Sequence, residues 1–195
     1  MDPATELPFR ILTAVLLILG TVIRVYYQRK TAGVARTISE YDRKDKSPRA
    51  LPTYAYFPAV LYIFTPWMDF AHLPLPLWLR WLGVLVFCAG SVLFAWTHHA
   101  LGVNWSGKLA LADGHVLVTS GPYRYVRHPM YTAFFLNAIG YLLLTANWLI
   151  GPLPLLADIW MYLARVDAEE AMMTEQFGDA YRDYMQRTGR LLPKL

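Results

Sequence analysis

The feature that most limits the fold is the presence of apolar segments as long as a bilayer is thick. Pro8–Tyr27 carries charge only at Arg10 and Arg24, and Trp78–Ala100 carries none after Arg80. A helix of about 20 residues crosses a hydrocarbon core of about 30 Å. We therefore expect these segments to be membrane-spanning helices and the chain to be an all-α integral membrane protein.

The alternation of apolar and polar segments predicts five transmembrane helices in a single domain, residues 1–195. They cover residues 8–27, 51–70, 78–100, 130–146 and 149–165. The second contains Pro52, Pro58 and Pro66, which should kink or partly break it. A tight turn at Asn147 and Trp148 joins the last two into a C-terminal helical hairpin, and the pattern of the fifth continues into a charged extension.

The basic residues predict the orientation of these helices. Fifteen of the 18 Lys and Arg residues lie in residues 28–50, residues 101–127 and the tail from residue 165 onward. With five spans these segments share one side of the membrane, and an excess of Lys and Arg marks the cytoplasmic side. We predict a multi-pass protein of the bacterial or archaeal plasma membrane, or of the endoplasmic reticulum in a eukaryote. Its C-terminus should face the cytoplasm.

The composition argues against several other classes of protein. Hydrophobic residues make up 56% of the chain and charged residues 16%, a shift towards membrane proteins. The net charge is +4, but apolar runs separate the basic residues too widely for a DNA-binding domain, so we expect no nucleic-acid partner. Cys88 is the single cysteine, which leaves no intramolecular disulfide and no cysteine-based metal site, and we predict no metal.

A cluster of ionisable and aromatic residues stands at the start of the fourth span. The stretch 121–131 contains Arg124, Arg127, His128 and three tyrosines, and an apolar run follows it. Ionisable groups at the edge of hydrocarbon are functional candidates because their placement there is costly. The alternative is a basic stop signal with an interfacial aromatic belt. Pro129 suits the first turn of a helix, which places His128 at the helix entrance.

A second polar group follows the fifth span. Arg165 and Glu169 are four residues apart, so they lie on one helix face. They could form a surface ion pair worth only a few tenths of a kcal/mol. The predicted hairpin, however, brings Glu169 beneath His128 and Tyr131. An acid, an imidazole, tyrosines and an arginine at one membrane boundary could hold a charged cofactor and an amphipathic substrate.

Two further segments each allow a structural and a functional interpretation. His98 and His99 end the third span, and adjacent histidines do not share a helix face, so interfacial residues are favoured over metal ligands. Val116–Val118 lies between two glycines and predicts a turn with an extended segment. The functional alternative for that segment is a backbone edge lying against a flat ring such as adenine.

These polar motifs resemble a known family. The runs DGHVLVTSGPY at 113–123, RHPMY at 127–131, the pair at 169–170 and TGRLLP at 188–193 are similar to the signature of isoprenylcysteine carboxyl methyltransferases. The resemblance covers residues 101–195, which would be the catalytic half. Related membrane phospholipid methyltransferases share part of the pattern. One departure follows Tyr131, where Thr132-Ala133 stands in place of a nearby glycine common in the family.

The resemblance implies S-adenosylmethionine bound in a cytoplasm-facing pocket and a lipid-like or isoprenoid acceptor that arrives from the bilayer. The positions that would bind the cofactor are Lys108, His115, Val116, Leu117, Val118, Tyr123, His128, Pro129, Met130, Tyr131 and Glu169. Lys108 stands where family members can carry another polar residue. Arg165 falls where the family binds the carboxylate of the substrate.

The implied chemistry suits these residue types. An acceptor carboxylate is ionised at neutral pH, so methyl transfer to it requires no strong base. Arg165 can hold such a carboxylate through two parallel hydrogen bonds, and tyrosine faces attract a sulfonium cation. If the nucleophile were an amine or a thiol, His128 or Glu169 would be the candidate proton acceptor. The catalytic candidates are therefore Arg165, His128 and Glu169.

Three alternatives remain open beside a carboxyl methyltransferase. A phospholipid or other small-molecule methyltransferase would use the same cofactor with a different acceptor. An NADPH-dependent membrane reductase would need more clustered basic residues than Lys108, Arg124 and Arg127 supply. A non-enzymatic membrane scaffold would use the polar edge only to fix its topology.

Overall fold

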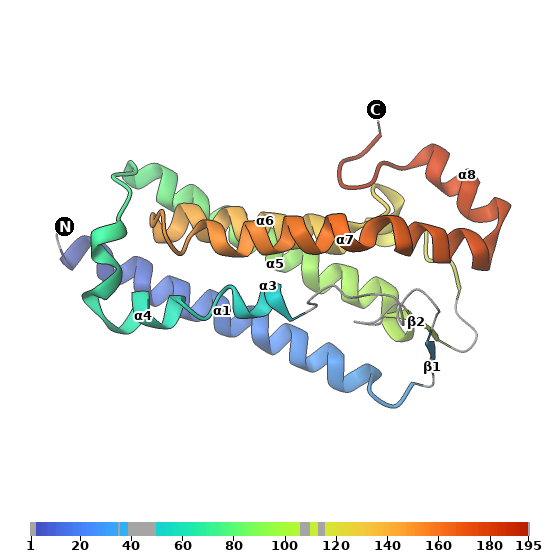
Figure 1. The fold of residues 1–195 in the computed structure, drawn as a ribbon, viewed down its shortest axis with the longest axis horizontal. Coiled ribbons are helices and arrows are strands. Elements are labelled where there is room, and N and C mark those ends of the chain that lie inside the picture. The colour runs from blue at the N-terminus through green and yellow to red at the C-terminus, as the bar shows by residue number, and fades with distance from the viewer. Residues whose placement is uncertain (1–2, 35, 39–49, 106–109, 113–115, 195) are drawn as a thin grey trace.

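The computed structural model describes residues 3–34, 36–38, 50–105, 110–112 and 116–194. Helices dominate this part of the chain, and the long ones run lengthwise beside one another (Figure 1). The α-helices are α1 Pro3–Thr31, α3 Leu51–Tyr54, α4 Ala59–Phe64, α5 Leu77–Leu101, α6 Pro129–Thr145, α7 Pro152–Phe177 and α8 Asp179–Arg187. Three 3₁₀ helices are η1 Pro66–Ala71, η2 Gly102–Asn104 and η3 Gly121–Arg124.

A short antiparallel sheet accompanies the helices. Strand β1, Arg36–Ile38, pairs with β2, Ala110–Ala112, and Thr37 lies opposite Leu111. The sequence predicted an extended segment at Val116–Val118 but no strand at Arg36–Ile38 or Ala110–Ala112. The pairing joins the chain after α1 to the chain after η2, at the same end of the molecule as α8 (Figure 1).

Among the described residues, two helices are long and apolar enough to cross a membrane by length and composition, namely Thr5–Thr31 and Leu77–Asn104. They match the first and third predicted spans and extend beyond their predicted ends. Many of their apolar side chains face outward, among them Ile18 at 63% exposure and Val92 at 68%. Water does not favour such a continuous apolar surface, whereas lipid chains solvate it.

The other predicted spans differ in form. The structure divides residues 51–70 into α3, α4 and η1, because Pro52, Pro58 and Pro66 each stand at or next to the start of a helix. The predicted interruption is confirmed, and a continuous helix is absent there. The helix α6 follows its predicted bounds closely, and α7 continues as one helix to Phe177.

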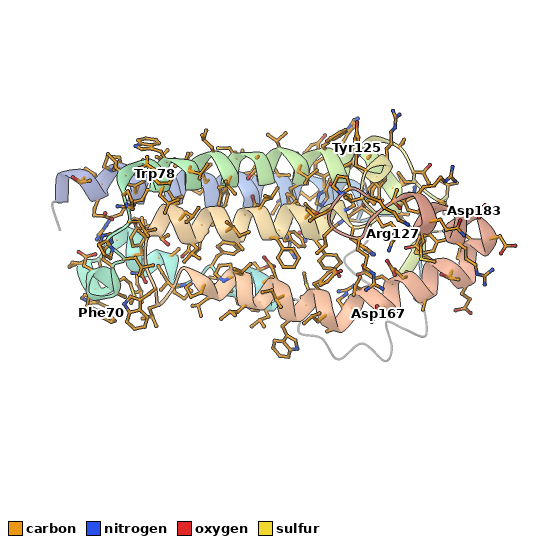
Figure 2. The ribbon with its side chains drawn as sticks, turned by 90° about the horizontal axis from the view of Figure 1, so that it is seen from above. Phe70, Trp78, Tyr125, Arg127, Asp167 and Asp183 are labelled. Carbon is orange, nitrogen blue, oxygen red and sulfur yellow. The ribbon has the colours of Figure 1, made fainter. Side chains whose placement is uncertain are left out.

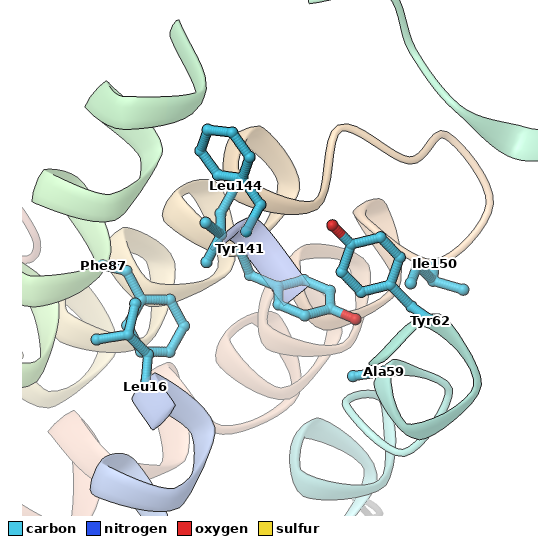
Figure 3. Packing of buried hydrophobic residues seen from close by; sticks show 8 residues of the cluster. Leu16, Ala59, Tyr62, Phe87, Tyr141, Leu144 and Ile150 are labelled. Atoms are coloured by element: carbon cyan, nitrogen blue, oxygen red, sulfur yellow. The ribbon is translucent and has the colours of Figure 1, made fainter. Parts of the chain in front are cut away.

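The helices α5 and α6 pack with their backbones in close contact. A Cβ atom added to Gly140 would lie 2.5 Å from the backbone nitrogen of Phe87, and one added to Gly83 would lie 2.7 Å from that of Leu144. Both glycines are therefore required by the approach of the two helices. Beside this contact, buried side chains from α1, α4, α5 and α6, with Ile150 from the turn before α7, form the apolar core around Tyr141 (Figure 3).

A buried ion pair connects four helices at the end of the molecule far from α8. Arg80 on α5 pairs with Glu6 on α1, and both side chains are at most 5% exposed. Tyr62 on α4 lies 3.3 Å from both partners. Arg80 also donates from Nε and Nη2 to the Leu144 carbonyl, at 3.3 and 3.1 Å, and so binds the C-terminal end of α6. This end of α6 is consequently fixed by charge-assisted hydrogen bonds.

The turn between α6 and α7 is stabilised by one asparagine. Ala146 adopts a left-handed conformation with φ of 45°, and the Asn147 side chain accepts from the backbone N–H groups of Leu149 and Ile150 at 3.0 Å. Its amide also donates to the Met68 carbonyl at 2.8 Å. The predicted tight turn is confirmed, and it is additionally tied to η1.

Candidate functional site

The site begins where η3 leads into α6. His128 has non-helical backbone angles and precedes the first residue of α6, Pro129, as the sequence predicted. The backbone N–H groups of Arg127 and His128 donate to the carbonyls of Gly189 and Arg190, at 2.8 and 2.9 Å. The chain after α8, residues 188–194, therefore lies against the start of α6 and fixes the position of His128. We name these residues the C-terminal segment.

Four side chains converge between α6 and α7. The Tyr131 hydroxyl donates to Glu169 Oε1 at 2.8 Å, and Arg165 Nε lies 3.4 Å from the same oxygen. The other carboxylate oxygen of Glu169 lies 3.6 Å from His128 Nδ1. The hairpin brings together the four residues that the sequence singled out, and we name them the Glu169 cluster.

Burial makes this cluster more than a surface ion pair. The Arg165 side chain is 7% exposed and that of His128 9%, whereas Glu169 keeps 22%. An ion pair in such surroundings is only weakly screened by salt and water. The partly exposed carboxylate of Glu169 is the part of the cluster that an incoming cation can reach.

A second carboxylate lies beside the cluster and has a different set of partners. Glu170 accepts from Arg127 Nε at 3.0 Å, from His128 Nε2 at 3.2 Å and from Arg190 Nη2 at 2.7 Å. Arg190 also pairs with Asp167 at 2.8 Å. Figure 2 shows Arg127 and Asp167 at the end of the molecule occupied by α8.

These contacts control the charge of Glu170. Burial raises the pKa of its carboxyl group, but hydrogen bonds from His128, Arg190 and Arg127 outweigh burial and lower the pKa to about 2. The hydrogen bond with Glu170 correspondingly raises the pKa of the Arg190 guanidinium above its ordinary value. Glu170 is therefore a fixed negative charge at neutral pH.

The tyrosines around η3 belong to the support of the site. The Tyr184 hydroxyl of α8 donates to the Tyr123 carbonyl at 2.6 Å, which joins α8 to η3. Burial raises the pKa of the Tyr123 phenol well above its usual value, so this group stays neutral. The Tyr131 ring contacts Tyr162 of α7 edge-on, with centroids 5.2 Å apart.

The remaining residues that were predicted to bind the cofactor do not belong to the Glu169 cluster. Lys108 and His115 lie outside the described residues. Val116–Val118 has neither helical nor strand structure, and Val116 is 60% exposed. Pro129 is buried and Met130 half-buried at the start of α6. Contact of these residues with a nucleoside stays a prediction.

Sequence reasoning missed the partners of Glu170 and the surroundings of one histidine. Arg190 stands 20 residues after Glu170, a separation that no helical spacing could reveal. For His98 and His99 the sequence favoured interfacial residues over metal ligands. The structure buries the His98 side chain fully against the rings of Tyr27, Phe94 and Trp105. Aromatic packing places it inside the protein. Within the described ranges, no group of three His, Cys, Asp or Glu side chains is arranged for a metal ion.

Comparisons with known proteins point to one family. Residues 81–175, which include the Glu169 cluster, match the sequence profile of the isoprenylcysteine carboxyl methyltransferase (ICMT) family. The chain is therefore similar to the ICMT family over just under half of its length. The predicted resemblance is confirmed, and the ICMT match begins earlier in the chain than the motifs that suggested it.

Individual relatives are similar over part of their length. A protein-S-isoprenylcysteine O-methyltransferase of Tribolium castaneum is 34% identical over 118 residues, which cover 60% of this chain and 42% of that protein. The enzyme of the same name from Schizosaccharomyces pombe is 38% identical over 80 residues, 40% of this chain and 34% of that one. The matches thus take in less than half the length of these relatives.

A solved structure agrees with the fold. The eukaryotic intramembrane Ras methyltransferase ICMT superimposes with a TM-score of 0.55 and 30% identity. The superposition covers 80% of this chain and 54% of the other. The similarity therefore extends beyond the sequence match to most of the helices in this chain.

Proposed function

We propose that this protein is an S-adenosylmethionine-dependent methyltransferase that acts on a lipid-like acceptor, and that the acceptor group is the carboxylate of an isoprenylcysteine-type molecule. The observation that carries the proposal is the Glu169 cluster, where an acid, an arginine, a tyrosine and a histidine meet between α6 and α7. The match of residues 81–175 to the ICMT family supports the same reaction.

The side chains present fit the cofactor. S-adenosylmethionine carries an ammonium group, and when bound it supplies a methyl group on a sulfonium. Glu169 would hold the ammonium group, because its carboxylate is partly exposed while its neighbours are buried. Tyr131 and Arg165 hold that carboxylate in one orientation, which reduces the entropy lost on binding. Rings such as that of Tyr131 favour a nearby sulfonium cation.

Arg165 would serve the acceptor. It is the first charged residue of α7 after Asp158, and its side chain lies one helical turn from Glu169. A guanidinium binds a carboxylate through parallel hydrogen bonds and so orients an oxygen lone pair for attack. Because the carboxylate is already ionised, the protein contributes position and exclusion of water rather than proton transfer.

We further propose five membrane spans with the site facing the cytoplasm. The outward apolar side chains of α1 and α5 and the similarity to an intramembrane methyltransferase support this arrangement. Reporter fusions after Gly33, Leu73, Gly114, Asn147 and Leu195 are expected to lie in, out, in, out and in. An external C-terminus would contradict both the topology and the orientation of the site.

Calorimetric titration in detergent tests the cofactor. Wild-type protein should bind S-adenosylmethionine and S-adenosylhomocysteine, and Glu169→Gln and His128→Ala should bind both more weakly while remaining folded. Loss of a charge-assisted hydrogen bond costs about 1.5–3 kcal/mol. Binding of NADPH instead would indicate a reductase, and binding of neither would indicate a scaffold.

A transfer assay tests the acceptor. A labelled methyl group should reach farnesylcysteine and should not reach its amide, in which the carboxylate is blocked. Transfer to a phospholipid amine with none to farnesylcysteine would replace the proposed acceptor with a lipid headgroup.

A further inference from the structure

Glu169 and Glu170 are adjacent in sequence but face different surroundings. Successive residues of a helix point about 100° apart, so the two carboxylates cannot share one face. Glu169 contacts Tyr131 and Arg165, whereas Glu170 contacts Arg127 and Arg190. His128 lies between the two acids, with Nδ1 near Glu169 and Nε2 near Glu170.

The C-terminal segment contacts this same histidine and its neighbours. The Arg190 carbonyl accepts from the His128 backbone N–H, and the Leu191 carbonyl accepts from the Thr132 hydroxyl at 2.9 Å. The Arg190 guanidinium holds Glu170 through both of its oxygens. The segment therefore contacts His128 directly through its backbone and indirectly through Glu170.

We propose that Glu170 is a positioning residue, and that Arg190 of the C-terminal segment acts through it to fix the ring of His128 beside Glu169. The docked segment is then part of the cofactor site, and its Arg190 side chain acts from the far side of Glu170. This inference deepens the proposed function and rests on it.

The geometry assigns a distinct role to each nitrogen of the ring. A carboxylate only accepts hydrogen bonds, so the contact of 3.2 Å requires His128 Nε2 to carry a proton that it donates to Glu170. Arg127 and Arg190 keep Glu170 ionised and in place. The ring is thereby held with Nδ1 towards Glu169. An acid that holds a functional imidazole in this way acts on orientation and tautomer.

A purely structural ion pair is the competing explanation. Arg190 is 42% exposed and also pairs with the exposed Asp167, so it could merely attach the tail. Under that explanation its removal would lower stability without changing the ring of His128. The two explanations differ in a property of the histidine that can be observed without any ligand.

Nitrogen NMR of ¹⁵N-histidine-labelled full-length protein in detergent provides that observation. Comparison with His128→Ala identifies the His128 signals. The Nε2–H signal should be present in wild type, and should shift or broaden in Arg190→Ala and in Glu170→Gln. Arg182→Ala is the matched control, because Arg182 lies on α8 and pairs only with Asp179 among the described residues. A His128 spectrum in Arg190→Ala identical to that of Arg182→Ala would overturn the inference.

Binding and kinetics complete the test. S-adenosylhomocysteine should bind Arg190→Ala about three- to tenfold more weakly than Arg182→Ala, with the KM for farnesylcysteine unchanged. Arg190→Lys, which keeps the charge, should recover part of the affinity. Equal affinities in Arg190→Ala and Arg182→Ala would refute the coupling. Failure of wild type to bind the probe would refute the proposed function alone, because the NMR comparison needs no ligand.

Discussion

Tyr131→Phe tests how the Glu169 cluster is organised. The substitution removes one hydroxyl group, which donates to Glu169 at 2.8 Å, and keeps the ring that packs against Tyr162. Tyr131 is only 6% exposed, so water does not readily replace the lost donor. The remaining contacts to Glu169, from Arg165 at 3.4 Å and His128 at 3.6 Å, are longer.

The expected magnitude follows from this geometry. A hydrogen bond to a charged group contributes about 1.5–3 kcal/mol. A cofactor that requires the carboxylate in its present orientation should lose up to that amount, or about ten- to a hundredfold in Kd. Titration with S-adenosylhomocysteine measures the loss. Tyr125→Phe, the same chemical change at a site 53% exposed, should leave Kd unchanged.

A double-mutant cycle decides whether the hydroxyl acts through the acid. If it does, Tyr131→Phe should have little further effect in a Glu169→Gln background, so the coupling energy should nearly equal the effect of the single change. Strictly additive effects would refute the reasoning and show that the hydroxyl acts on the ligand or the fold independently of Glu169.

Three other substitutions follow from contacts described above. Arg80→Met should lower the free energy of unfolding by about 3–5 kcal/mol in detergent, because it leaves Glu6 charged and buried. Adding Glu6→Gln should restore much of the lost stability. A loss no larger than that caused by Arg182→Met, at an exposed ion pair, would contradict the prediction. Because the pKa of Glu170 is lowered in the folded protein, its carboxylate stabilises the fold at pH values above the ordinary carboxyl pKa, and this stability is lost as pH falls towards about 2. Thermal unfolding scans from pH 6 to 3 should therefore show a steeper loss of Tm in wild type than in Glu170→Gln. Parallel profiles would contradict the prediction. Arg165→Lys keeps the positive charge but loses the planar guanidinium that binds a carboxylate through two hydrogen bonds. This variant should bind S-adenosylmethionine normally and methylate a carboxylate acceptor poorly. Loss of cofactor binding would instead assign Arg165 to the cofactor site.

Local spacing was sufficient to predict much of the site. Arg165 and Glu169 are separated by one helical turn, and the structure places them 3.4 Å apart on α7. Pro129 predicted the start of α6 and thus the position of His128. Such predictions succeed because a helix fixes the relative direction of residues three and four apart, whatever surrounds it.

Contacts between distant residues could not be predicted in this way. Glu6 and Arg80 are 74 residues apart, and no pattern in the sequence connects them. Their burial depends on how α1, α4 and α5 pack, which no single segment specifies. The same holds for Arg190 and Glu170, since the path of the chain after α8 decides whether the tail returns to the start of α6.

The close packing of α5 and α6 determines which parts of the molecule can move. Gly83 and Gly140 allow the two backbones to touch, and separating them would leave a gap that no side chain is present to fill. Arg80 holds the far end of α6 through the Leu144 carbonyl. The α5–α6 pair is therefore a rigid wall beside the Glu169 cluster. Under the proposed function, we expect the described elements that move to admit a cofactor to be α7 and the C-terminal segment.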